Sequence, residues 1–134
     1  MEPLTIWEQY VEPQIFKVFQ IEMIVDDPTF TIADDPILAN WDVPLQLATA
    51  NKKGSGEQRK MAMTGQGQLQ SMDADNIAKA AIFSTFAGFI TNHIALTSDA
   101  SLAYAQGYNN WLYDYCQKDK NRLRGVGLTS RHIT

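Results

Sequence analysis

The two histidines, His93 and His132, are the side chains with the clearest capacity for metal chemistry. A hydrolytic zinc site commonly uses three protein ligands and keeps one coordination position open, so an aspartate or glutamate would have to complete the set. The histidines are far apart in the sequence and show neither H-x-H nor H-x-x-x-H spacing. We therefore expect no metal site built by this chain alone.

The other reactive side chains favour structural roles. Cys116 is the only cysteine, which excludes an internal disulfide and a multi-cysteine metal site. It lies on the apolar side of a predicted helix, and the sequence identifies no nearby base that would activate its thiol. We therefore expect Cys116 to be a small buried hydrophobic residue. Asp73 and Asp75 are two positions apart at a helix-to-strand boundary. We interpret them as turn and cap residues, not as an acid/base pair.

Composition places the chain among ordinary globular proteins. It has 134 residues, of which 45% are hydrophobic and 19% are charged, which is typical of one folded domain. The net charge of −4 argues against a nucleic-acid partner, which would require a basic surface. There is neither a signal-peptide pattern nor an apolar run of about 18 residues, so we expect a cytoplasmic protein without a membrane segment. We interpret the basic residues near the end as a solvated turn, not a phosphate site: Lys118, Lys120, Arg122, Arg124 and Arg131.

Residues 1–67 are predicted to form an irregular N-terminal excursion. A short helix over residues 4–12, capped by Thr5, should end at Pro13. The β-branched and aromatic run at residues 15–25 favours a strand, although a short helix has the same apolar content.

The middle of the chain carries turn and loop signals. The Asp-Asp-Pro sequence at residues 26–28 and 34–36 marks two turns, with a short hairpin around residues 29–33. Residues 51–68 are rich in glycine, lysine and glutamine and predict a mobile surface loop. Their glycine spacing does not match a phosphate-binding loop.

Residues 68–134 show a stronger pattern, that of a β-α-β unit with parallel strands and a right-handed crossover. After a turn at residues 119–121, the second strand contains glycines where a neighbouring element should pack closely. The predicted elements are a short helix at 68–77, a buried strand at 78–86, a loop at 87–99, a helix at 99–118 capped by Ser98 or Asp99, and a strand at 123–128.

The long helix contains an aromatic and aliphatic stripe. Apolar residues recur at steps of three and four, which predicts a face packed on the sheet: Leu102, Ala105, Tyr108, Leu112 and Tyr115. The alternative is a small binding protein that contacts a ligand through Tyr104, Tyr108, Trp111 and Tyr115.

Two blocks, residues 2–23 and 68–128, resemble the amidohydrolase-related superfamily. The similar branch contains aminocarboxymuconate-semialdehyde decarboxylase and γ-resorcylate decarboxylase. "EPLTIWEQYVEP" is similar to a family EP-x-x-LWE-x-Y pattern, and the second block carries the more specific likeness. The matching positions of the second block are Met72, Asp73, Ile77, Ser84, Thr85, residues 108–112, Tyr115, Cys116 and residues 122–126.

This resemblance implies the N-terminal portion of a (β/α)₈ barrel enzyme, with residues 68–134 supplying strands 2 and 3. The complete family enzyme would be a hydrolase or a decarboxylase (a lyase) that uses a divalent metal such as zinc on a small-molecule substrate. Its ligands would lie before Glu2 and after Thr134, so this chain alone is expected to be inactive. Truncation or a changed reading frame would explain the divergence after Leu128.

By the same resemblance, Thr85 and Phe86 at the end of the first parallel strand, and His93 in the loop after it, are the candidate substrate-pocket residues. Strand-end packing is the alternative role of Thr85 and Phe86. His132 is expected to be a terminal residue.

A partial barrel would leave strand edges and one apolar sheet face open. We expect the chain to self-associate, to dock on a second polypeptide that completes the barrel, or to use residues 26–68 as a cover. The alternative function is therefore a non-catalytic subunit or interaction module.

Overall fold

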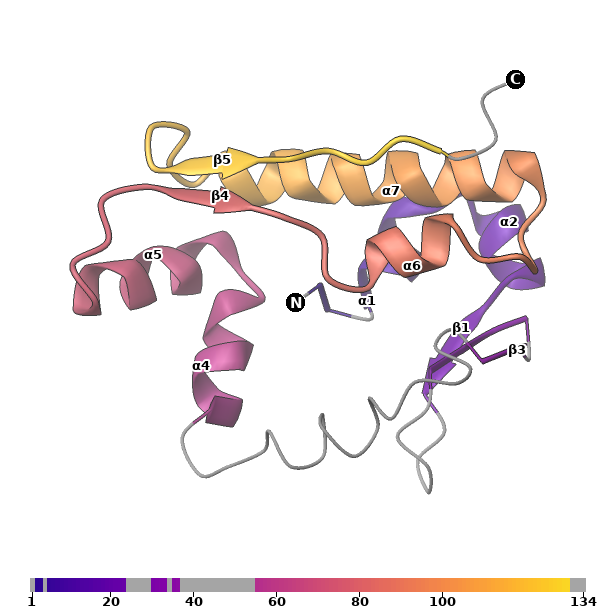
Figure 1. Ribbon diagram of the computed structural model, residues 1–134, viewed down its shortest axis with the longest axis horizontal. Coiled ribbons are helices and arrows are strands. Elements are labelled where there is room, and N and C mark those ends of the chain that lie inside the picture. Colours follow the sequence, from indigo (N-terminus) through magenta and orange to yellow (C-terminus); the bar gives the residue numbers. More distant parts are fainter. Residues whose placement is uncertain (1, 4, 24–29, 34, 37–54, 131–134) are drawn as a thin grey trace.

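The computed structural model describes residues 2–3, 5–23, 30–33, 35–36 and 55–130 (Figure 1). The fold mixes helices with two small sheets, one antiparallel and one parallel. The helices are α1 Thr5–Tyr10, α2 Pro13–Val18, α4 Ser55–Ala62, α5 Gly65–Ala74, α6 Ala87–Thr91 and α7 Ser98–Cys116, and the strands are β1 Ile21–Met23, β2 Phe30–Ile32, β3 Asp35–Pro36, β4 Ala80–Ile82 and β5 Leu123–Gly125.

The predicted β-α-β unit is confirmed as a parallel pair of strands connected through α7. Ala80 of β4 pairs with Leu123 of β5, and Ile82 pairs with Gly125. The ladder continues past β5, where the Val126 N–H donates to the Ile82 carbonyl at 2.9 Å. The long helix α7 runs beside the two strands in Figure 1.

Both strands are shorter than predicted, and the first is not buried on both faces. Phe83, which follows β4 directly, is 67% exposed, and Ala81 is also exposed. The predicted loop at residues 87–99 contains the short helix α6. Thr97, not Ser98 or Asp99, caps α7, because its hydroxyl accepts the Ala100 N–H at 3.2 Å.

The stripe on α7 faces the core, as predicted, except for Leu102. Tyr104 and Tyr108 are fully buried, and Ala105, Leu112 and Tyr115 are buried beside them. Leu102 is exposed, because its position on the helix turns away from this face. Three of the four aromatic residues named in the alternative, Tyr104, Tyr108 and Tyr115, are buried, and Trp111 is half-buried.

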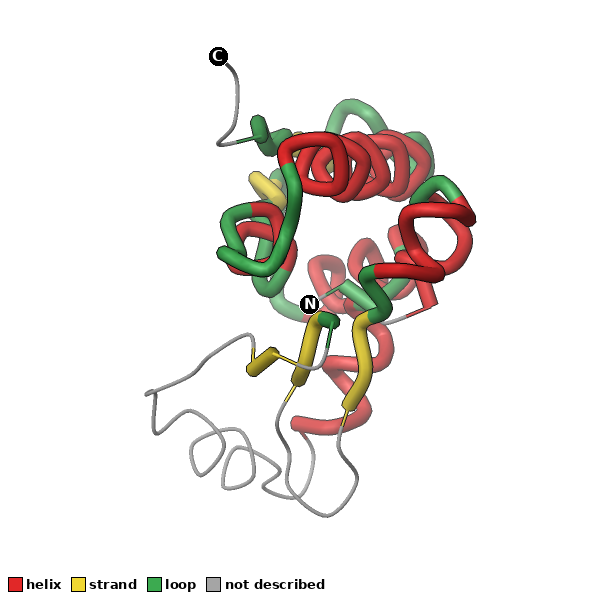
Figure 2. The backbone as a smooth tube through the Cα atoms, turned by 90° about the vertical axis from the view of Figure 1, so that its right-hand side faces the viewer, coloured by secondary structure: helices red, strands yellow, loops and turns green. Residues whose placement is uncertain are grey.

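α1 packs against α7 and brings the start of the chain into the same core (Figure 2). Trp7 contacts Tyr104 with ring centroids 5.5 Å apart. At Gly107 of α7, an added Cβ would lie 2.9 Å from a Val11 methyl carbon and 3.0 Å from the Tyr10 carbonyl oxygen. Glycine there permits the close approach of the two helices.

The strand predicted at residues 15–25 is mostly wrong. Residues 13–18 form α2, and among the described residues of this run only β1, Ile21–Met23, is a strand. Residues 24 and 25 lie outside the described part of the chain. Pro13 was predicted to end the preceding helix, but it also begins α2. Its fixed φ and missing N–H are well tolerated at the first position of a helix. The apolar content of this run is compatible with a helix or a strand. Pro13, at the first position of α2, favours the helix.

The predicted hairpin is confirmed, because β2 pairs antiparallel with both β1 and β3. Thr31 pairs with Pro36 and Ile32 with Asp35, and the backbone turns at Ala33 with a φ of 49°. Asp35 and Pro36 of the second Asp-Asp-Pro sequence form β3, so the turn predicted at these two residues is wrong and the chain turns before them. Asp34 and the first Asp-Asp-Pro sequence, at residues 26–28, lie outside the described residues.

The loop predicted at residues 51–68 is wrong from residue 55 onward, where α4 and the first turn of α5 form. Thr64 caps α5, since its hydroxyl accepts the Gly67 N–H at 3.1 Å. A Cβ at Gly67 would lie 2.0 Å from the Met61 carbonyl oxygen. This glycine therefore serves the close packing of α5 against α4 and is not a sign of a flexible loop.

α5 agrees with the short helix predicted at residues 68–77 but ends three residues earlier, at Ala74. Asn76 has a φ of 55°, and the Ile77 N–H donates to the Met72 carbonyl at 2.8 Å. This hydrogen bond across a left-handed residue is a usual helix ending. Leu69 and Met72 are buried as expected, but Ile77 lies beyond the helix and is exposed.

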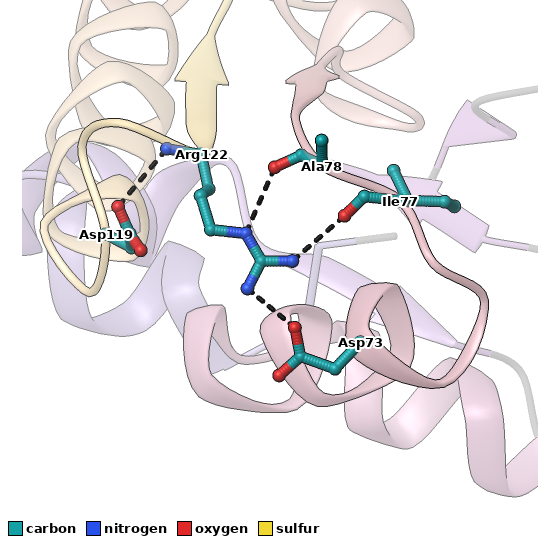
Figure 3. Close-up of polar contacts among 5 residues, drawn as sticks. All are labelled: Asp73, Ile77, Ala78, Asp119 and Arg122. Carbon is teal, nitrogen blue, oxygen red and sulfur yellow. Dashed lines mark hydrogen bonds and ion pairs between the residues drawn. The ribbon is translucent and has the colours of Figure 1, made fainter.

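Arg122 connects the beginnings of the two parallel strands (Figure 3). Its guanidinium donates to the Ala78 carbonyl at 3.1 Å, to the Ile77 carbonyl at 2.9 Å and to an Asp73 carboxylate oxygen at 2.7 Å. The prediction of a simple solvated turn is therefore wrong for Arg122, and Asp73 is its ion-pair partner instead of a cap residue. Asp75 is the C-cap residue of α5, as predicted.

The other basic residues of this segment agree better with the prediction. Lys118, Lys120 and Arg124 are exposed to solvent. Arg131 lies outside the described residues.

We expect Arg122→Met to lower the free energy of unfolding by about 1–2 kcal/mol, because two backbone carbonyls lose a charged donor. The ion pair with the exposed Asp73 should add little. Urea unfolding would measure the change. The matched control is Arg124→Met, on the adjacent exposed face of β5, with an expected change within about 0.5 kcal/mol. Equal losses in the two variants would contradict a specific role of the Arg122 contacts.

Candidate functional site

The carboxyl end of β4 opens into a hollow of about 590 Å³. Ser84 and Thr85, which follow the strand, form one wall. The other walls come from α6 and from the turn after it: Gly88, Phe89, Asn92, His93 and Ile94. In parallel α/β folds, this end of a strand is the usual position of a binding site.

The structure brings two of the three predicted pocket residues to this hollow. Thr85 and His93 line it, although they are separated by the whole of α6. Phe86 does not line it; it is the N-cap residue of α6 and packs partly buried against the core. The strand-end packing role was therefore correct for Phe86.

His93 is held in one orientation by its own turn. Its Nδ1 accepts the Ala95 N–H at 3.2 Å, so in the neutral imidazole the proton is on Nε2. The turn that follows α6 therefore orients the His93 ring at the edge of the hollow.

The other lining residues that the structure describes are uncharged, and some of them are apolar. The Asn92 amide donates to the Gly88 carbonyl at 2.7 Å, which directs its donor group back toward α6. Phe89 is partly exposed and Ile94 is 87% exposed, so both present apolar surface to solvent. Such a combination of hydroxyl, amide and imidazole groups with apolar side chains is usual in sites for small molecules.

Glu2 reaches the same strand end from the start of the chain, which the sequence did not predict. It is only 6% exposed. One carboxylate oxygen accepts the Thr85 N–H at 2.6 Å, and the other accepts the Phe86 N–H at 3.2 Å. Two amide donors satisfy the buried carboxylate, as a buried charge requires.

Tyr108 of α7 contributes a second buried polar group. Its hydroxyl is buried and has no hydrogen-bond partner among the described residues. Burial raises the pKa of Tyr108, and the negative charges of Glu2 and Cys116 raise it further. Glu2 is thus close enough to act electrostatically on the core as well as on the strand end.

The residues do not fit a metal centre. Across residues 2–3, 5–23, 30–33, 35–36 and 55–130, no three histidine, cysteine, aspartate or glutamate side chains come together. His132 lies outside these ranges. A metal implied by the resemblance would need ligands from outside the described residues.

Cys116 is buried at the end of α7, as predicted for a small hydrophobe. Burial raises the pKa of its thiol, while a hydrogen bond from the Gly125 backbone opposes this. A raised pKa reduces the thiolate fraction and hence nucleophilicity. Its role is packing between α7 and β5.

The glycines after Leu123 permit close packing on α7, as predicted. A Cβ at Gly125 would lie 2.7 Å from the Leu112 side chain, and one at Gly127 would lie 3.0 Å from Oδ1 of the Asn109 side chain. The Asn109 amide both donates to the Leu128 carbonyl and accepts the Leu128 N–H, each at 2.8 Å. It therefore holds the chain after β5 along α7, in the manner of a neighbouring strand.

Comparison of the chain with protein-family models, with curated proteins and with solved structures found no match. Among the helices of the described ranges, none has both the length and the apolar character needed to cross a lipid bilayer. The chain has a mixed helix and strand fold that contains a small parallel sheet.

Proposed function

We propose that this chain is the N-terminal portion of an amidohydrolase-related, metal-dependent hydrolase or decarboxylase. In this proposal β4, α7 and β5 are two neighbouring strands of a (β/α)₈ barrel and the helix between them. The remaining strands would supply the ligands for zinc or another divalent metal. The chain alone would be inactive.

The supporting observation is the uncovered face of the parallel sheet. Ala80 and Ile82 pack against the core on the same side as Leu123, and α7 covers this side. Their alternating neighbours are exposed on the opposite side: Ala81, Phe83, Arg124 and Val126. In a barrel, this second side faces the interior and is covered by the other strands.

The same observation supports the alternative function, a non-catalytic subunit whose missing strands belong to a different polypeptide. An exposed strand edge beside an apolar face favours pairing in either case. Metal content separates the two functions. An assembled form that binds zinc while this chain alone does not favours the enzyme, and an assembled form without zinc favours the non-catalytic subunit.

We expect the purified chain to be a dimer or larger by native mass spectrometry and to hold much less than one zinc per chain. Phe83→Lys should shift it toward the monomer, because it places a charge on the uncovered face. The matched control is Val18→Lys on α2, since Val18 is 66% exposed and Phe83 is 67% exposed. A wild-type monomer with cooperative calorimetric unfolding would count against an incomplete barrel, as would identical masses for the two variants.

A further inference from the structure

The outer edge of β4, on the side away from β5, presents backbone groups that are open to a partner. Alternate residues of a strand direct their N–H and C=O groups to opposite edges. Ala80 and Ile82 direct theirs to β5, so Lys79, Ala81 and Phe83 direct theirs to the outer edge. Within the described part of the chain, no group hydrogen-bonds to the backbone of these three residues, and all three are exposed.

Contacts from other elements close this edge at both ends. Before the open part, the Arg122 guanidinium donates to the Ile77 carbonyl at 2.9 Å (Figure 3). After it, the Glu2 carboxylate accepts the Thr85 N–H at 2.6 Å. The open edge therefore covers residues 79–83, with Ala81 at its centre.

The outer edge of β5 has its donors occupied by the chain itself. The Leu123 N–H donates to the Asp119 carbonyl at 2.9 Å, and the Gly125 N–H donates to the Cys116 thiol. Only β4 of this pair thus offers its backbone to another chain. Its partner must be an extended strand, because a helix satisfies its backbone groups internally.

We propose that two copies of this chain pair through their β4 strands, antiparallel and centred on Ala81. A two-fold axis there places Ala81 opposite its counterpart and Lys79 opposite Phe83 of the second copy. Each of these pairs exchanges two N–H···O hydrogen bonds, because the backbone groups of all three residues face the partner. The inference rests on the proposed function in taking β4 as a strand without its neighbour, and it names that neighbour in the isolated chain.

The side chains are complementary in this arrangement. Directly opposite residues of an antiparallel pair have Cβ atoms about 4.5–5.5 Å apart, so the Lys79 side chain lies against the Phe83 ring of the second copy. The lysine stem covers apolar surface there, and its ammonium is attracted to the ring. The two copies of Lys79 are about 14 Å apart along the strands, beyond the screening length of physiological salt.

Disulfide cross-linking of cysteine variants tests the register. Ala81→Cys should cross-link to its counterpart, because opposite Cα atoms about 5.5 Å apart suit a disulfide. Ala78→Cys is the matched control, since Ala78 is also exposed but its two copies would lie about 20 Å apart. The wild-type chain, whose single cysteine is buried, should not cross-link. Equal cross-linking of the two variants, or a wild-type chain that stays monomeric at every concentration, would overturn the proposal.

Exchange of charges between the opposed positions is the second arm of the test. Phe83→Lys should raise the dimer dissociation constant in native mass spectrometry severalfold to about tenfold, because lysines then oppose each other twice. Adding Lys79→Glu should reverse this loss, since each opposed pair becomes a glutamate and a lysine. Lys17→Glu in the Phe83→Lys chain is the matched control, because Lys17 is exposed on α2 and the net charge changes equally. Absence of rescue by Lys79→Glu, or equal rescue by Lys17→Glu, would overturn the register.

The pairing and the barrel function can fail separately. A dimer that cross-links at Ala78 and not at Ala81 would overturn the pairing and leave the metal-dependent function standing. Cross-linking at Ala81, together with an assembled form that holds no zinc, would support the pairing and count against the enzyme.

Discussion

Replacing Trp7 with alanine should lower the free energy of unfolding by about 3–5 kcal/mol, the usual cost of removing a large buried aromatic side chain. Trp7 is 1% exposed and contacts Tyr104 at the interface between α1 and α7. Its loss would leave a cavity and weaken the attachment of the first helix. Because small domains are stable by only about 5–15 kcal/mol, such a loss would remove a large part of the stability.

Urea unfolding followed by circular dichroism measures this change. Tyr113→Ala is the control, because Tyr113 is an aromatic residue of α7 that is 66% exposed. Its substitution should change the free energy by less than about 0.5 kcal/mol. A Trp7→Ala loss below about 1 kcal/mol would show that α1 is not part of the cooperative core.

The second large effect is alkaline unfolding, which we expect between about pH 10 and pH 12. Burial raises the pKa of Tyr104, Tyr108 and Tyr115, the last to about 12. Cys116 also contributes to the raised pKa of Tyr115. In the unfolded chain, these hydroxyls ionise near the ordinary tyrosine pKa of about 10.

The sign of the effect follows from proton binding. Below about pH 10 the three tyrosine hydroxyls keep their protons in both the folded and the unfolded state, so the free energy of unfolding is not reduced. Above it, the unfolded state releases protons that the folded state retains, so stability falls by up to about 4 kcal/mol per pH unit. The loss continues until the pH passes the folded-state pKa values.

Tyrosinate absorbance and circular dichroism during an alkaline titration would measure this transition. Tyr108→Phe should move the midpoint to higher pH and cost little at neutral pH, because its hydroxyl has no hydrogen-bond partner among the described residues. Tyr113→Phe, at an exposed position, should leave the midpoint unchanged. Gradual ionisation from pH 10 without loss of structure would contradict the prediction.

Glu2 and Trp7 together connect the beginning of the chain to α7 and to the parallel pair of strands. Trp7 packs on α7, and Glu2 binds the end of β4. Residues from both halves of the chain therefore contribute to one hydrophobic cluster. Substitutions in the first segment should therefore also affect the end of β4.

Local patterns predicted the elements that depend mainly on residues close in sequence. α7 follows from its apolar spacing, and the parallel pairing of β4 with β5 follows from two apolar runs separated by a long helix. The hairpin around β2 follows from its turn residues. Where apolar content fitted two structures, as in α2, the sequence pattern was insufficient.

The sequence by itself thus determined the long helix, its core-facing aromatic side chains and the strands it connects, because periodicity decides which face of an element avoids water. Only the tertiary structure decided that the glycines at residues 65 and 67 permit close helix packing, and that Glu2 occupies the amides of Thr85 and Phe86. Those partners are distant in sequence or depend on backbone proximity, and no local pattern encodes such contacts. The exposed face of the parallel strands and the hollow at the end of β4 likewise arise from how the elements pack.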